Sequence, residues 1–233
     1  MGLLLYQNEA CLVINKLPGE SSEFPALPEA VKGKVFPVHR LDTPVSGCLL
    51  LAKNQKTAAF LSAAFAGPEA VCQKNDGQAR VEKIYWAIIE KPRGGITIPS
   101  EATFVHWISE DGKANKSFAF TVAGPGHISQ RSFQRKKAIM RYRLIGQGDN
   151  YLFLEIDLVT GRHHQIRAQL AAEGLHTKGD LKYGAKRSEK QGGIRLHAFS
   201  LAFPDPLHSD ETIKVETLPP VMDSLWEAFR SSS

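Results

Sequence analysis

The chain has 233 residues, of which 42% are hydrophobic and 23% are charged, and its formal net charge is +5. These proportions are typical of a globular protein with a buried core, and they exclude collagen-like and intrinsically disordered chains. No apolar run approaches the roughly 20 residues that a membrane-spanning helix requires, and the three cysteines lack metal-ligand spacing. We therefore expect a cytoplasmic protein with free thiols and no membrane partner.

The first part of the chain alternates apolar runs with turn residues. Residues 3–6 and 11–14 are apolar runs on either side of a polar turn, which predicts a β-hairpin. Residues 20–37 are rich in Pro and Ser and are expected to form a surface loop. The continuous apolar run at 48–52 predicts a strand buried on both faces. Residues 54–65 predict a helix whose first residue, an asparagine, caps its amino end.

The rest of the chain predicts two more helices and several strands. One helix is expected over residues 162–173, with Thr160 as its cap and Gly174 at its end. Another is expected over residues 221–230, and residues 67–79 look like an insertion between regular elements. Further strands are expected at residues 84–89, within 96–121, at 151–158 and at 194–203.

The order of these elements indicates the class of fold. Strands outnumber helices and follow one another in adjacent pairs, which favours an α+β fold over repeated βαβ units. The chain has no internal repeat and no low-complexity region. We expect a single domain over residues 1–233, with a largely antiparallel mixed β-sheet flanked by helices and loops.

Basic residues gather in two segments. Residues 131–143 contain six Lys or Arg and no acid, and residues 178–195 contain six with two acids among them. Such segments could hold the phosphates of a nucleic acid. Two solvated surface faces are the simpler explanation when charge alone is considered.

Two side chains in the first half of the chain stand out as candidates for chemistry. Asp42 follows His39 and comes just before a Ser-Gly turn and the apolar run at 48–52. It would lie on a loop at the edge of a rigid sheet, as catalytic groups often do, although a turn aspartate can equally cap nearby amides. Tyr85 projects a phenol from the next predicted strand, where it could stack on a base or pack in the core.

A third candidate is the basic start of the helix predicted after the strand at 151–158. Arg162 lies in the expected first turn, where the helix dipole disfavours a cation, and Arg167 lies one turn later. An anion held there would explain this placement, and a solvated helix face is the alternative. His163 and His164 are adjacent and would point in different directions on a helix, so we expect no metal site.

These segments together resemble the RluA family of RNA pseudouridine synthases. The family's HRLD motif, followed by a small turn, Ser-Gly and an apolar strand ending in Ala-Lys, is similar to HRLDTPVSGCLLLAK at residues 39–53. Four further motifs follow in the family's order, namely KIY at 83–85, TGRHHQIR at 160–167, GDLKYG at 179–184 and LHA at 196–198. The resemblance covers nearly the whole chain and implies the catalytic domain of the pseudouridine synthase fold.

The resemblance implies an isomerase that detaches a uracil from its ribose, rotates it and rejoins it through carbon 5. Asp42 would be the catalytic carboxylate, which attacks the sugar, attacks the ring or acts as a base. Arg167 would keep Asp42 ionised and could hold both of its oxygens. Tyr85 would stack on the target base and could help to remove the proton from carbon 5. No redox step or group donor is needed, so no cofactor is expected.

The resemblance also implies an RNA partner, either ribosomal or transfer RNA. Arg40, Arg162 and Leu196 would bind the substrate, with Leu196 as an apolar wall and Arg40 in the gap that the extruded uridine leaves. We expect a monomer without a metal and without a separate S4-type RNA-binding domain. Residues 175–178 stand where the family usually has His-Pro, which leaves the target RNA open.

Two other functions remain as alternatives. A catalytically silent RNA-binding relative is one, although binding alone would not require Asp42, Tyr85 and Arg167 together. A glycoside hydrolase is the other, because it too attacks an anomeric carbon. It requires paired carboxylates, and the sequence offers one carboxylate in a motif-like setting.

Overall fold

The computed structural model describes residues 2–66, 81–92, 97–121, 135–190, 192–208 and 210–232. The described residues form one 12-stranded sheet with few helices. The strands are β1 (Leu3–Gln7), β2 (Cys11–Lys16), β3 (Phe36–Pro37), β4 (Ser46–Ala52), β5 (Glu82–Glu90), β6 (Glu101–Asp111), β7 (Lys116–Thr121), β8 (Lys136–Gln147), β9 (Tyr151–Asp157), β10 (His176–Thr177), β11 (Leu196–Pro204) and β12 (Thr212–Glu216). The helices are α1 (Gln55–Phe65), α3 (Gln165–Ala172) and α4 (Ser224–Ser232), with a short 3-10 turn, η1 (Leu181–Tyr183).

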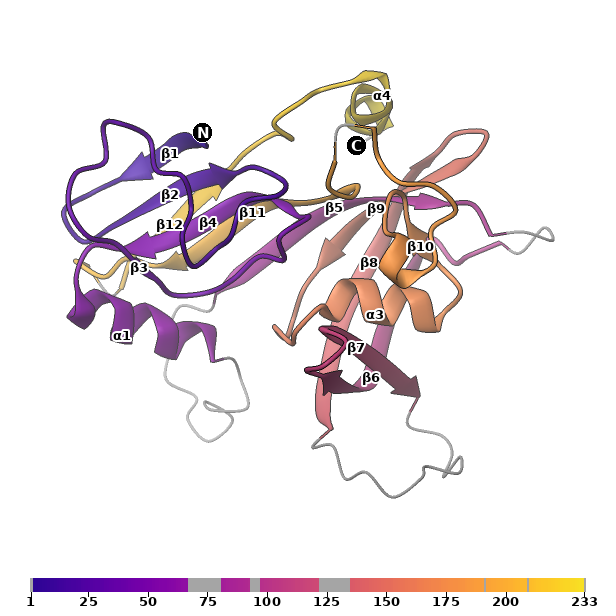
Figure 1. Cartoon of the computed structure of the whole chain (residues 1–233), viewed down its shortest axis with the longest axis horizontal. Coiled ribbons are helices and arrows are strands. Elements are labelled where there is room, and N and C mark those ends of the chain that lie inside the picture. The colour runs from indigo at the N-terminus through magenta and orange to yellow at the C-terminus, as the bar shows by residue number, and fades with distance from the viewer. Residues whose placement is uncertain are drawn as a thin grey trace.

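The sheet runs in the order β1-β2-β4-β11-β5-β9-β8-β6-β7, with β3, β10 and β12 paired off this path. Neighbouring strands are antiparallel except β4 and β11, which are parallel. Figure 1 shows α1 under the half of the sheet that contains β1, β2 and β4, and α3 and α4 on opposite sides of the half that contains β5, β9 and β8. The predicted α+β fold with a largely antiparallel mixed sheet is confirmed.

The elements near the amino end form as predicted. β1 and β2 make an antiparallel hairpin, and β4 is buried along its whole length. The Asn54 side chain caps α1, since its Oδ1 accepts the amide of Thr57 at 2.8 Å. Residues 20–37 form a loop whose only strand is the short β3. In the described part of the chain no helix is both long enough and apolar enough to cross a lipid bilayer.

The helix predicted over residues 162–173 is shorter, because α3 begins at Gln165. His164, the residue before it, has a φ of 50°, and this left-handed conformation cannot continue a right-handed helix. Thr160 does not cap the helix. Its hydroxyl accepts the amide of Ile139 at 2.9 Å and donates to Oε1 of Gln165 at 2.8 Å. Thr160 therefore joins the chain after β9 to β8, and its prediction as a helix cap was wrong.

Four strands were not predicted, namely the short β3 and β10 and the longer β8 and β12. In β8 the buried residues Ala138, Met140 and Tyr142 alternate with Ile139, Arg141 and Arg143, which are half-buried or exposed, and this is the pattern of a half-buried strand. Lys137, Arg141 and Arg143 therefore lie on one face of the strand, whereas Lys136 lies on the other. The insertion expected at residues 67–79 lies outside the described residues, as does the start of the first basic segment, residues 131–134.

The parallel junction of β4 with β11 explains two of the sequence motifs. Gly47 has a φ of 120°, and a Cβ at this position would lie 2.3 Å from the carbonyl oxygen of Ala198, so glycine is required here. Beside it, the Ser46 hydroxyl lies 2.9 Å from Nδ1 of His197, whose Nε2 donates to the Thr217 carbonyl at 2.8 Å. The Ser-Gly and Leu-His-Ala motifs thus hold the centre of the sheet together, next to the loop that carries the first motif.

Candidate active site

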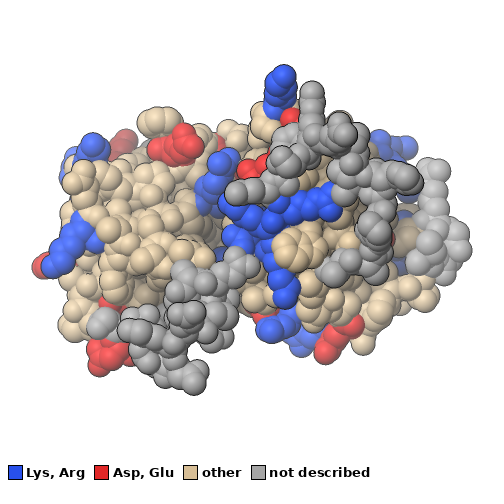
Figure 2. Space-filling model, turned by 90° about the horizontal axis from the view of Figure 1, so that it is seen from below, with Lys and Arg blue, Asp and Glu red and all other residues tan. Residues whose placement is uncertain are grey.

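A pocket of about 450 Å³ collects the predicted site residues. It is lined by the loop before β4, the end of α1, the start of β5 and the segment that leads into α3. Figure 2 shows the face of the molecule that carries α1 and α3, where Lys and Arg side chains gather near the centre. All six residues expected from the sequence line this pocket: Arg40, Asp42, Tyr85, Arg162, Arg167 and Leu196.

Buried contacts hold the loop that carries Asp42. The Ser22 hydroxyl donates to the carbonyl of Leu41 at 2.8 Å and accepts the amide of the same residue at 2.9 Å. The fully buried ammonium of Lys16 donates to the carbonyl of Thr43 at 3.3 Å. Both neighbours of Asp42 in the chain are therefore fixed, while its own side chain remains 15% exposed toward the pocket.

Arg167 joins two carboxylates. Its Nη1 donates to Oδ2 of Asp42 at 2.9 Å, and its Nε and Nη2 donate to Oδ2 and Oδ1 of Asp180 at 2.6 and 2.8 Å. The bidentate contact expected with Asp42 is therefore made with Asp180 instead. The guanidinium also lies over the ring of Tyr183, 4.7 Å from its centroid. Asp180 and Tyr183 thus fix the orientation of Arg167, which presents one N–H to Asp42.

Arg167 stays protonated although it is buried. Burial alone would lower the pKa of Arg167, but the hydrogen bonds and charges of Asp180 and Asp42 outweigh it and hold the pKa above its usual range. The side chain is 4% exposed, so its charge acts through a poorly solvated region where electrostatic interactions are strong. A cation fixed at this distance offsets the loss of hydration that a shielded carboxylate would otherwise suffer.

Tyr85 and Leu196 form part of the pocket's apolar wall. Both are buried and project from adjacent strands, β5 and β11. Burial, and after it the charge of Asp42, raises the pKa of Tyr85 far above its usual range. The hydroxyl of Tyr85 therefore keeps its proton near neutral pH, and its ring offers a flat surface beside the carboxylate.

His164 completes the surroundings of Asp42. Its Nε2 lies 3.7 Å from Oδ2 of Asp42, and its Nδ1 lies 3.0 Å from the hydroxyl of Tyr183. That hydroxyl also accepts the amide of Ser117 at 2.8 Å. Burial, followed by the charge of Arg167, lowers the pKa of His164 to about 3, so its ring is neutral and adds no second charge to the site.

Asp180, Tyr183 and His164 were not predicted as site residues. The available signal was their position within the GDLKYG and TGRHHQIR motifs. An aspartate after a glycine and a tyrosine three residues later have many local explanations. Only the folded chain brings both of them against Arg167.

Cations other than Arg167 also line the pocket. Arg162 lies in the turn before α3 and not in the helix, and its Nε donates to the carbonyl of Lys137 at 3.1 Å. The prediction that Arg162 opposes the helix dipole was therefore wrong. Lys83 and Arg40 line the pocket beside it. Burial lowers the pKa of Lys83 to about 8, since the nearby charge of Asp157 compensates only in part.

Several cations of the two basic segments are neutralised by acids of the same chain. Four of them make ion pairs: Arg141 with Asp157, Arg143 with Glu155, and both Lys178 and Arg195 with Glu189. The last two pairs lie partly buried near α4. The phosphate-binding role expected of both segments therefore applies less to these four residues than to the cations near the pocket.

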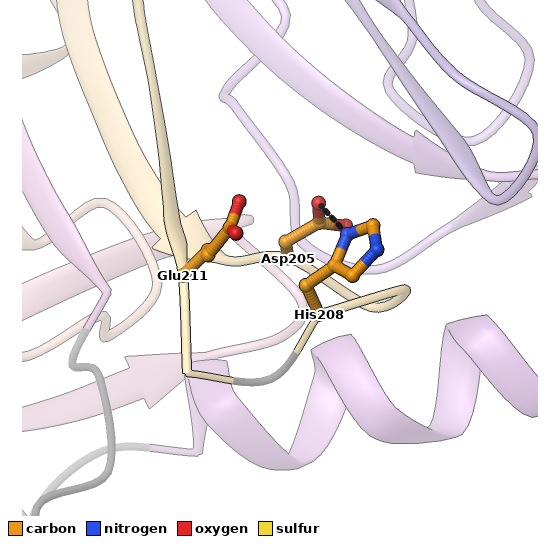
Figure 3. Close-up of side chains that lie close together, drawn as sticks. All are labelled: Asp205, His208 and Glu211. Atoms are coloured by element: carbon orange, nitrogen blue, oxygen red, sulfur yellow. Dashed lines mark hydrogen bonds and ion pairs between the residues drawn. The ribbon is translucent and has the colours of Figure 1, made fainter.

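A cluster of possible metal ligands lies away from the pocket, beside the turn between β11 and β12. Figure 3 shows Asp205, His208 and Glu211, whose ligand atoms all lie within 4.8 Å of one another. The Asp205 carboxylate already accepts the amide of Leu207 at 2.9 Å and contacts the His208 ring at 3.3 Å. These contacts explain the cluster as part of the turn, and His208 and Glu211 are exposed.

Comparisons with known proteins show the family and the fold. Residues 13–172 match the model of a family described as RNA pseudouridylate synthase. An uncharacterized RNA pseudouridine synthase of Zymomonas mobilis is 30% identical over 165 residues, which are 70% of this chain and 64% of that protein. The chain therefore spans less than two thirds of that relative. The tRNA pseudouridine synthase C of Haemophilus ducreyi is 28% identical over 245 residues, with 96% of this chain and 92% of that protein covered.

Solved structures share the fold. Human RNA pseudouridylate synthase domain containing 1 superposes with a TM-score of 0.67 at 22% identity, covering 100% of this chain and 94% of that one. Human RNA pseudouridylate synthase domain containing 4 superposes with a TM-score of 0.69 at 19% identity, covering 99% and 92%. The arrangement of strands described above is thus one that other chains adopt with quite different sequences.

Proposed function

Because the chain belongs to the RNA pseudouridylate synthase family, we propose that it is an RNA pseudouridine synthase, an isomerase that converts a particular uridine of a structured RNA into pseudouridine. The observation that carries this proposal is the buried contact of Asp42 with Arg167 in a pocket walled by Tyr85. Such a pocket presents one shielded carboxylate to a flat ring of limited size.

Asp42 is the residue that acts on the substrate. The reaction breaks the bond between N1 and carbon 1′ and forms a bond between carbon 5 and carbon 1′, while carbon 5 loses a proton and N1 gains one. Asp42 attacks the sugar or the ring, or removes a proton to start cleavage. In each route a carboxylate held by one N–H of Arg167 keeps lone pairs available for the substrate. The product is an isomer of the substrate, so the reaction needs no cofactor.

Tyr85 serves mainly as a surface for the base. Its hydroxyl keeps its proton near neutral pH because burial and Asp42 raise its pKa, so a free phenolate is not the base that removes the proton from carbon 5. The ring packs against the uracil, and Leu196 closes the same wall. Loss of the ring should therefore weaken binding more than loss of the hydroxyl does.

The substrate is an RNA whose target uridine leaves its stack. Extrusion of a base requires a few kcal/mol. Arg40 and Arg162 line the pocket; their contacts with the RNA offset this energy, and Arg40 fills the gap that the uridine leaves. A relative that covers 96% of this chain is named tRNA pseudouridine synthase C, so transfer RNA is the first substrate class to test, with ribosomal RNA as the other. We further propose that the chain works as a single catalytic unit and as a cytoplasmic monomer.

Tritium release tests this function directly. RNA labelled with tritium on carbon 5 of uridine, taken from cells that lack the protein, should release tritium with the wild type and not with Asp42→Asn. Asp149→Asn, a matched change at an exposed loop position, should behave as the wild type. Turnover by Asp42→Asn at the wild-type rate would refute the role of Asp42. RNA binding without any release by the wild type would identify a silent RNA-binding relative.

A further inference from the structure

The β6–β7 hairpin exposes an apolar face that the described residues leave open. β6 and β7 extend below α3 in the view of Figure 1. Four large apolar side chains on this hairpin are exposed, namely Val105 at 38%, Trp107 at 38%, Phe118 at 43% and Phe120 at 37%. Trp107 lies directly opposite Phe120 in the ladder, and directly opposite residues share a face of a sheet. The four side chains therefore make one surface, which we call the hairpin face.

The opposite face of the same strands is covered by α3. His106 of β6 is 2% exposed, and its ring nitrogen lies 3.1 Å from the Gln169 amide of α3. Ser117 of β7 is 1% exposed and contacts His163, just before α3, at 2.9 Å. The fold therefore uses one side of the hairpin for its own packing. The exposure of the aromatic rings on the other side needs a separate explanation.

Cations accompany each aromatic ring of the hairpin face. The guanidinium of Arg135 lies 4.4 Å from the centroid of Phe120, and the ammonium of Lys116 lies 5.5 Å from that of Phe118. Lys137 is exposed and lies directly opposite Trp107 in the β6–β8 ladder.

One acid also lies at the tip of this face. Asp111 pairs with Lys116 in the ladder, and its Oδ1 accepts two amides of the hairpin turn at 3.0 and 3.1 Å. The remaining cations, Arg135 and Lys137, leave the face basic. Rings with cations beside them suit a ligand that has both flat apolar groups and negative charge.

The hairpin face is connected to the pocket. Arg162 lines the pocket and donates to the carbonyl of Lys137, the residue opposite Trp107. Glu110, near the end of β6 on the face that α3 covers, lines the pocket as well. A chain of nucleotides that places one uridine in the pocket therefore has the hairpin face within reach of its neighbouring nucleotides.

We propose that the hairpin face binds unpaired nucleotides of the RNA substrate that adjoin the target uridine. Their bases stack on Trp107, Phe118 and Phe120, and their phosphates lie against Lys137, Arg135 and Lys116. Aromatic platforms of this kind accept any base, because every base has a flat face, so the hairpin favours single-stranded RNA without reading its sequence. A protein partner fits less well, since lysine is depleted from the cores of protein interfaces. The inference rests on the proposed function in that it takes RNA as the substrate.

Tryptophan fluorescence offers a direct test, since the chain has three tryptophans and two of them are buried. Trp86 and Trp226 are each 4% exposed, whereas Trp107 is 38% exposed. Acrylamide quenching should therefore report chiefly on Trp107. Single-stranded oligouridine is expected to protect Trp107 and to lower the quenching constant at least twofold. Unchanged quenching at saturating RNA would overturn the inference, and protection that grows with protein concentration alone would show that a second copy covers the face.

Substitutions give an independent result. Trp107→Ala should weaken the binding of single-stranded RNA about tenfold, whereas the affinity of Trp107→Phe should stay within about threefold of the wild type. The control is Phe24→Ala, which removes an 85% exposed ring outside the hairpin and should not change the affinity. Equal affinity of Trp107→Ala and the wild type, with both folded by circular dichroism, would refute the inference. Full tritium release with no protection of Trp107 would refute RNA binding by the hairpin face and leave the proposed function intact. Protection of Trp107 without any tritium release would refute the proposed function and leave RNA binding by the hairpin face intact.

Discussion

Nη1 of Arg167 lies 2.9 Å from Oδ2 of Asp42, and this single hydrogen bond joins residues 125 positions apart in the chain. Nε and Nη2 of the same guanidinium donate to Asp180. Arg167 is therefore a cation shared by two carboxylates, oriented by Asp180 and bound to Asp42 through Nη1. This division separates Asp180, which orients Arg167, from Asp42, the residue that we propose acts on the substrate.

Arg167→Lys should abolish most of the activity although it keeps the charge. A lysine ammonium cannot bind Asp180 in a planar bidentate manner and reach Asp42 as well. Loss of one charge-assisted hydrogen bond removes about 1.5–3 kcal/mol, which corresponds to a fall in single-turnover rate of about tenfold to 100-fold. Arg143→Lys, at an exposed ion pair with Glu155, should leave the rate unchanged. A wild-type rate for Arg167→Lys would mean that the planar, bidentate geometry of the guanidinium is not needed for the reaction.

Gly47→Ala should disrupt the fold at the junction of β4 and β11. The new Cβ would lie 2.3 Å from the carbonyl oxygen of Ala198, and the φ of 120° disfavours any side chain. We expect a loss of roughly 3 kcal/mol or more in the free energy of unfolding, measured by urea denaturation. Gly148→Ala has open space around it and should stay within about 0.5 kcal/mol of the wild type. Equal stabilities of the two variants would contradict the parallel junction.

The variant His164→Gly should have a more stable fold than the variant His164→Ala. His164 has a φ of 50°, which disfavours residues with a Cβ by about 1–2 kcal/mol, while glycine adopts it freely. His164→Gly and His164→Ala remove the same ring contacts with Tyr183 and Asp42, so the difference between them isolates the backbone. Urea denaturation should place the unfolding free energy of the glycine variant about 1 kcal/mol above that of the alanine variant. The reverse order, which is usual within helices, would show that α3 extends back through this position.

Lys83→Met should make the fold more stable at pH 7 and the enzyme slower. Burial lowers the pKa of Lys83 from 10.5 to about 8, so below pH 8 the folded protein contains a poorly solvated charge. As the pH rises from 8 to 10.5, the unfolded chain retains more protons than the folded one, and the stability of the wild type increases. The advantage of Lys83→Met in the urea midpoint should therefore shrink over this range.

The second buried lysine, Lys16, does not affect the comparison of Lys83→Met with the wild type. Burial lowers its pKa to about 8 as well, but Lys16 is present in both proteins and cancels from the difference between them. Single-turnover rates should fall about tenfold in Lys83→Met, because a cation that lines the pocket is lost. A variant that is less stable than the wild type at pH 7 would show that the ammonium of Lys83 is favourably paired.

Local sequence patterns anticipated most of the elements that frame the site. The cap at Asn54, the buried run of β4 and the strand β9 depend on residues only a few positions apart, and these predictions are confirmed. The helix start near Arg162 was wrong because Thr160 bonds to Ile139 of a strand that was not itself predicted. The strand β8 was missed because its charged residues suggested a solvated surface. The alternate residues between them are buried only because β8 pairs with β6 and β9.

By itself the sequence determined the family, the order of the motifs and the six residues that line one pocket, because motif identity and periodicity are properties of short segments. Tertiary structure alone decided that Arg167 grips Asp180 and offers one N–H to Asp42, and that Gly47 must lack a side chain beside Ala198. These contacts join residues far apart along the chain except for Asp180, which is 13 positions from Arg167. Their geometry follows from how the strands pair and where buried charges find partners, and no window of neighbouring residues contains that information.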